Sequence, residues 1–160
     1  MKKIAWAWYC SVVLAGLGWT GVHAQTAATV SARPAVVQTP APAGLYAALG
    51  EKAGIERLVD NFVDRLVRHP RIGSHFKGIK PAAAKEGLTD HFCHLTGGPC
   101  VYQGSNMREL HADMKINKAD FNALVETLQR AMDDQGIPFA QQNRFLALLA
   151  PMHRDIITVH

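Results

Sequence analysis

From residue 45 onward, apolar residues recur at steps of three and four, which is the spacing of amphipathic helices. The clearest run predicts a helix over 53–68, built on Ile55, Leu58, Val59, Phe62, Val63, Leu66 and Val67. Further helices are predicted over 45–49, 81–95, 106–112, 117–135 and 139–158. No segment has a convincing strand pattern and none is an internal repeat, so the predicted fold class is all-α.

Local signals at the helix ends agree with this pattern. The helix over 53–68 must end at His69, because the residue before Pro70 is pushed out of the helical region. Pro81 suits the first turn of the next helix, and the run 96–99 (Thr-Gly-Gly-Pro) breaks the chain after it. Asn117 and Asp120 have the spacing of an N-cap and its reciprocal partner.

The first 43 residues have a different character. Lys2 and Lys3 precede an uncharged apolar stretch over 4–17, and Val22-His23-Ala24 offers small residues for a signal peptidase. We expect a signal peptide over 1–24, cleaved after Ala24, then an Ala/Pro-rich flexible linker over 25–43 and one domain over 44–160. The protein would then be exported to the periplasm. A retained anchor is the alternative, although the apolar stretch is short for a membrane span.

The charge balance argues against a nucleic-acid partner. Seventeen Lys and Arg against thirteen Asp and Glu give +4, and removal of Lys2 and Lys3 leaves +2. A surface that binds nucleic-acid phosphates needs a larger excess of positive charge or a run of basic residues, and the sequence has neither. The only membrane contact we expect is through an uncleaved signal segment.

Two cysteines remain after the expected cleavage, Cys93 and Cys100. In an oxidising compartment they form either a disulfide or a pair of free thiols, and the sequence does not decide between them. A zinc site that adds His94 is less favoured, because the spacing matches no usual ligand pattern. No Cys-x-x-Cys-His motif is present, so c-type haem attachment is not indicated.

One histidine has a distinctive apolar setting. His111 shares a helix side with Met107, Leu110 and Met114. A lone imidazole in apolar surroundings suits haem iron better than other metals, but such a histidine is also common in ordinary cores. Its neighbours alone therefore do not make His111 a ligand.

The order of motifs along residues 45–158 resembles that of the group I truncated globins. The matching pieces are Leu45-Tyr46, Leu49-Gly50, Asp60-Asn61-Phe62, Pro70 through Phe76, Phe92, Thr96 through Pro99, Tyr102-x-Gly104 and Met107-x-x-x-His111. The ungapped interval from Phe76 to His111 also fits the family. Each piece is weak alone, but together they are specific.

The resemblance implies a two-over-two helical sandwich that encloses one haem b per chain, with His111 as the proximal iron ligand. It places one set of residues around the cofactor: Phe76, Ala84, Leu88, Phe92, Met107, Leu110, Met114, Ile116, Phe121 and Leu124. Most of these apolar residues would also suit a plain core.

The sequence departs from the family on the distal side. Many members carry Tyr where this chain has Val63, and polar residues, often Gln, where it has Ala84 and Leu88. The usual donors to bound dioxygen are therefore missing. His91 follows Ala84 and Leu88 on one helical stripe. It either contacts the haem edge or a ligand, serves as a sixth ligand, or is a half-exposed histidine near a haem propionate or in the helix interface. We favour the last of these.

The expected function is binding of dioxygen, carbon monoxide or nitric oxide, as in oxygen-transport globins. Alternatives are a periplasmic redox enzyme, either a nitric oxide dioxygenase or peroxidase-like, a six-coordinate electron carrier, and a haem-free interaction module. The redox alternatives need an unidentified reductant, which the chain does not encode. The enzyme question stays open, with no catalytic residue assigned.

Overall fold

The computed structural model describes residues 41–159, so the expected signal peptide and nearly all of the linker lie outside the described residues. The elements in chain order are α1 (Leu45–Ala48), α2 (Glu51–Arg68), η1 (Gly73–Phe76), α3 (Pro81–Leu95), α4 (Met107–His111), α5 (Lys118–Asp134), α6 (Phe139–Leu149), η2 (Ala150–Met152) and α7 (His153–Ile156). The described part contains no strand, which confirms the all-α fold class. None of its helices is long and apolar enough to cross a membrane.

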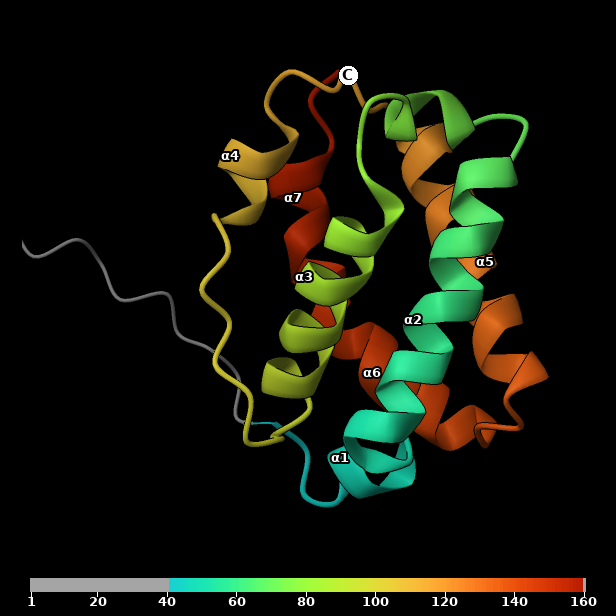
Figure 1. The fold of residues 1–160 in the computed structure, drawn as a ribbon, viewed down its shortest axis with the longest axis vertical. Helices are drawn as coiled ribbons and strands as arrows, with labels where there is room; N and C mark the ends of the chain where they lie inside the picture. Colours follow the sequence, from blue (N-terminus) through green and yellow to red (C-terminus); the bar gives the residue numbers. More distant parts are fainter. Residues whose placement is uncertain (1–40, 160) are drawn as a thin grey trace, which may run out of the picture. The chain divides into compact units, whose positions relative to one another are not determined.

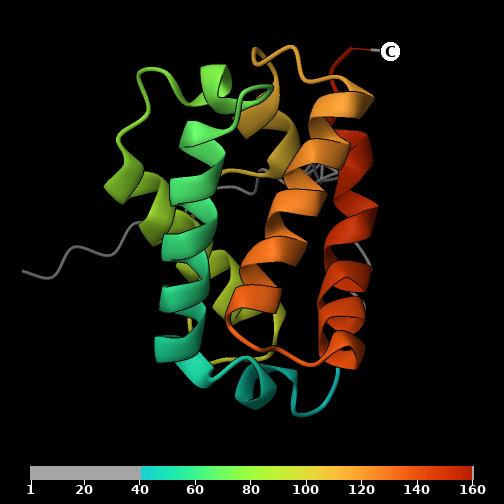
Figure 2. The same cartoon turned by 90° about the vertical axis from the view of Figure 1, so that its right-hand side faces the viewer.

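The helices form the predicted two-over-two sandwich. Helix α2 packs along α3 and also along α5, while α1 closes the end near α6. Figure 1 shows α2 beside α3, and Figure 2 shows α2, α5 and the α6–α7 run as neighbouring columns. Phe92 of α3 packs against both α2 and α6. Its ring centroid lies 6.5 Å from that of Phe62 in α2 and 4.8 Å from that of Phe145 in α6.

Helix boundaries follow the local signals closely. His69 leaves the helical region with φ −69° and ψ 129°, and Pro81 begins α3. Asn117 and Asp120 form the predicted capping box, in which the Asn117 side chain accepts from the Asp120 amide at 3.0 Å. These ends are therefore set by residues next to the helices themselves.

The prediction of one helix over 139–158 is wrong. The chain forms α6, a 3-10 turn and then the short α7. Pro151 lies at the break, because proline lacks the amide hydrogen that a continuing helix requires and its ring crowds the preceding turn.

Among the described glycines, Gly54 has the least room for a side chain. A Cβ added to this residue of α2 would lie 2.0 Å from the carbonyl oxygen of Leu49. A Cβ added to Gly87, inside α3, would meet nothing within 4 Å. The two helical glycines therefore have opposite surroundings.

We expect Gly54→Ala to destabilise the fold by about 1–3 kcal/mol through overpacking. Gly87→Ala is the matched control and should stabilise the fold by about 0.5–1 kcal/mol, because alanine removes backbone freedom from the unfolded chain. Urea unfolding followed by circular dichroism measures both changes. Equal shifts in the two variants would contradict the packing argument.

Candidate functional site

A cavity of about 1250 Å³ lies among the helices and is lined mainly by apolar side chains. Its walls come from α2, α3, the segment 101–105, α4, α5 and the α6–α7 run. This volume exceeds the roughly 300–1,000 Å³ of typical small-molecule pockets. The cavity therefore has room for a large apolar group.

Most of the predicted site residues meet at this cavity. Those that line it are Phe76, Ala84, Leu88, His91, Phe92, Met107, Leu110, His111, Met114, Phe121 and Leu124. They come from four separate stretches of chain, and the structure brings these stretches together at one cavity. Leu110 lines the cavity but remains 54% exposed, so it lies at the rim.

Two predicted residues, Val63 and Ile116, do not line the cavity. The α2 residues that face it are Phe62 and Leu66, which share one helix side at a step of four, so Val63 points elsewhere and is fully buried in the core. Ile116 lies in the link between α4 and α5, where its carbonyl accepts from the amides of Thr158 and Val159. Its role is to hold the C-terminal segment.

The position of His111 follows from a five-residue helix. Asn106 caps α4 by accepting from the Glu109 amide at 2.9 Å, which fixes where the helix begins. One turn later, Nδ1 of His111 lies 2.8 Å from the carbonyl oxygen of Met107. Since a carbonyl can only accept, Nδ1 carries the hydrogen and Nε2 keeps its lone pair. This is the tautomer that a metal ligand requires.

Sequence reasoning missed a second imidazole of the same type. His153 lines the cavity, and its Nδ1 lies 2.8 Å from the Ala150 carbonyl oxygen, so its Nε2 is also free to accept. His153 is exposed, whereas His111 is half-buried beside Met107 and Met114. The step of four from Leu149, another lining residue, is the sequence signal that could have found it.

His91 is buried, which corrects the expectation that it is half-exposed. Its side chain is 8% exposed, and its ring centroid lies 4.6 Å from that of Tyr102. Neither ring nitrogen has a hydrogen-bond partner within residues 41–159. Burial, with a smaller contribution from His94, lowers the pKa of His91 to about 4, so the ring is neutral at pH 7.

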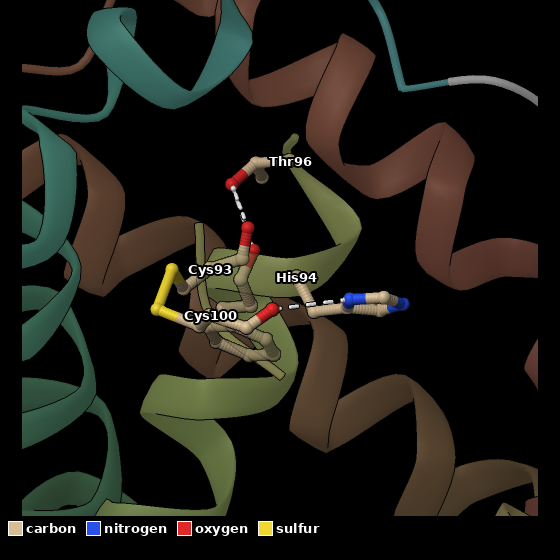
Figure 3. The surroundings of a disulfide bond; sticks show 5 residues. Cys93, His94, Thr96 and Cys100 are labelled. Atoms are coloured by element: carbon tan, nitrogen blue, oxygen red, sulfur yellow. Dashed lines mark hydrogen bonds between the residues drawn. A yellow bond between two sulfur atoms is a disulfide. The ribbon is translucent and has the colours of Figure 1, made fainter. Parts of the chain in front are cut away.

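A disulfide joins Cys93, near the end of α3, to Cys100, as Figure 3 shows. Cys100 immediately precedes Val101 and Tyr102, which line the cavity. His94 reinforces the link, because its Nδ1 lies 3.3 Å from the Cys100 carbonyl oxygen. The bond therefore fixes one cavity wall to α3, and it uses both sulfurs of the alternative zinc site.

The geometry defines a class of protein: an all-helical sandwich whose large apolar cavity presents an imidazole from a short helix. The bacterial-like globin family model matches residues 44–158, and the chain belongs to that family. Its members hold haem and bind diatomic gases. The resemblance to truncated globins predicted from the sequence is thereby confirmed.

Individual relatives give the same assignment. A group 1 truncated hemoglobin of Mycolicibacterium paratuberculosis is 26% identical over 117 residues, covering 73% of this chain and 86% of the relative. One from Synechocystis is 28% identical, covering 71% of this chain and 96% of the relative. The crystal structure of truncated hemoglobin from Tetrahymena pyriformis has a TM-score of 0.68 at 26% identity, covering 71% of this chain and 97% of that one.

The residues present fit a haem group. The apolar lining suits a flat macrocycle, and Nε2 of His111 is a nitrogen that could ligate its metal. Within residues 41–159, no cluster of three His, Cys, Asp or Glu side chains could hold a metal ion unaided. A single imidazole is what a metal already held by a macrocycle needs from the protein.

The burial of His91 should make stability depend on pH. In the unfolded chain His91 becomes protonated near its ordinary pKa of 6.5, whereas in the folded chain burial lowers that pKa to about 4. The free energy of unfolding should therefore fall as pH drops through this window, by about 3 kcal/mol in total. His91→Phe should lose that dependence, since phenylalanine does not titrate.

Urea unfolding at pH 7, 5.5 and 4 tests this expectation. The exposed neighbour His94 provides the control, and His94→Gln should keep most of the wild-type slope. If wild type and His91→Phe lose stability in parallel, burial of a neutral His91 is not the cause.

Proposed function

We propose that this chain binds one haem b per molecule, with Nε2 of His111 as the proximal iron ligand, and takes up a diatomic gas on the opposite haem face. The observation that carries the proposal is the 2.8 Å hydrogen bond from His111 Nδ1 to the Met107 carbonyl. It orients the ring and leaves only Nε2 for the metal. When bound, haem supplies an iron atom with a coordination position for the gas.

The flanking residues support His111 over its rivals. Met107 and Leu110 of α4 line the cavity beside His111, with Leu110 at the rim, and Met114 lines it just after the helix. His153 offers the same tautomer but is exposed, and His91 has neither ring nitrogen held by a partner in the described part of the chain. A ligand with a fixed ring orientation in apolar surroundings is the better holder of iron.

The residues opposite support weak retention of dioxygen. Phe62, Ala84 and Leu88 line the cavity and provide no donor, and the Tyr102 hydroxyl already donates to the Ser105 carbonyl at 3.0 Å. Bound dioxygen gains from a charge-assisted hydrogen bond, which these side chains do not offer. His91 also lines the cavity, with ring nitrogens that have no partner among the described residues, so we infer rapid gas exchange where this ring does not reach the bound ligand.

Export of the protein to the periplasm is part of the proposal. The N-terminal pattern over 1–24 suggested it, and the Cys93–Cys100 disulfide supports it, since stable disulfides are typical of oxidising compartments. The sulfur pairing also supports non-covalent haem b, because neither of these thiols is left for a thioether bond.

Substitution of His111 tests the proximal assignment. We expect His111→Ala to lose the ferrous five-coordinate spectrum and to release haem to an apoglobin scavenger at least tenfold faster. Added imidazole should restore part of the Soret band by replacing the missing ring. His153→Ala is the matched control and should retain the wild-type spectrum.

An unchanged spectrum in His111→Ala would overturn the assignment, and its loss in His153→Ala would transfer the role to that residue. Absence of a Soret band in wild type after haem titration would overturn haem binding itself. A titration endpoint other than one haem per chain would contradict the stoichiometry.

The distal proposal is tested by adding a donor. Leu88→Gln places an amide where many truncated globins carry a polar residue, and we expect it to slow dioxygen release about tenfold or more. Leu88→Met is the control for side-chain size and should leave the rate within about twofold. Stopped-flow displacement of dioxygen by carbon monoxide measures the rate, and equal rates would contradict an unassisted distal face.

A further inference from the structure

A second groove, of about 460 Å³, lies between α2 and α5, away from the haem cavity. Figure 2 shows these two helices side by side. The groove is lined by Asn61, Arg65, Arg68, His69, Pro70, Thr127 and Arg130. Three guanidinium groups and an imidazole thus share one small depression, and none of the lining residues is acidic.

The three arginines differ in how far they are already neutralised. Arg65 forms an ion pair with Asp134 and also donates to Asn61. The hydrogen bond from Asn61 and the Arg65 guanidinium lower the pKa of Asp134, so that carboxylate stays ionised and remains with Arg65. The charge of Arg65 is therefore already balanced by Asp134.

The other two guanidiniums are available. Arg130 lies 3.9 Å from Glu126, with both side chains 63% exposed, and such solvated pairs are worth little. The Arg68 side chain is exposed, and its guanidinium forms no ion pair or hydrogen bond within residues 41–159. The guanidinium groups of Arg68 and Arg130 thus keep N–H donors for a ligand from solution.

The remaining polar groups favour a ligand rich in acceptors. His69 Nδ1 accepts from the Arg71 amide at 3.2 Å, so a neutral ring carries its hydrogen on Nε2 and still presents a donor. Thr127 donates its hydroxyl hydrogen to the Ala123 carbonyl at 2.7 Å, and Asn61 has both its oxygen and its nitrogen engaged. The lining offers mostly unused donors.

Compensation of the α2 dipole explains only part of this cluster. Arg65 and Arg68 lie in the last turn of α2, where positive charge offsets the free carbonyls. Arg130 comes from the neighbouring helix and lies outside its last turn. Its presence beside Arg68 is therefore not accounted for by helix-end electrostatics.

We propose that this groove is an oxyanion-binding site, in which Arg68 and Arg130 grip a phosphate or carboxylate group and His69 adds a donor. Guanidinium groups match both oxyanions with paired hydrogen bonds. The site is built entirely from residues outside the haem cavity.

Titrations of the full chain with inorganic phosphate and, separately, with citrate test the proposal. Amide chemical shifts are followed by nuclear magnetic resonance at constant ionic strength, with chloride as the balancing anion. We expect saturable shifts centred on the groove, and the anion with the lower Kd identifies phosphate or carboxylate as the preferred group.

Variants separate a specific site from general charge. Arg68→Ala and Arg130→Ala should each raise the Kd at least fivefold, whereas Arg57→Ala, an exposed arginine on α2 outside the groove, should change it less than twofold. Linear, unsaturated shifts, or an equal effect of Arg57→Ala, would overturn the site. Because no groove residue lines the haem cavity, failure of this titration leaves the haem proposal untouched, and the two failures are distinguishable.

Discussion

The fold is governed by the need to bury apolar helix faces around a space as well as against one another. Helices α2, α3 and α5 each direct large side chains, such as Phe62, Phe92 and Leu128, both into the core and towards the cavity. A domain of this size normally fills its interior to near-crystalline density, because empty volume costs stability. The helices are therefore complementary to a large group, and the cofactor of this family completes their core.

Local chemistry explains why so much of the fold could be predicted from the sequence. The stripe along α2, the proline that begins α3 and the Asn117–Asp120 box each act within one or two turns. Such signals survive in any tertiary setting because their partners are close in the chain. The candidate site was found differently, through the order of motifs, which reflects the family rather than the physics of any one residue.

The failures concern orientation and packing. Pro151 divides the last predicted helix, a break that apolar periodicity does not reveal. Val63 was expected on the distal side of the haem, but Phe62, one residue earlier on a different helix face, lines the cavity instead. The burial of His91 depends on Tyr102, eleven residues away across the glycine turn, and a one-dimensional pattern does not contain that contact.

The disulfide also determines how the domain can open. By joining Cys93 to Cys100, it makes the wall that carries Tyr102 part of α3, so this side cannot swing away without α3 itself. Helix α4 is held to the rest mainly through α7, including the exposed Arg108–Asp155 ion pair. One side of the cavity is thus restrained by a covalent bond, whereas the contacts between α4 and α7 on the other side are non-covalent.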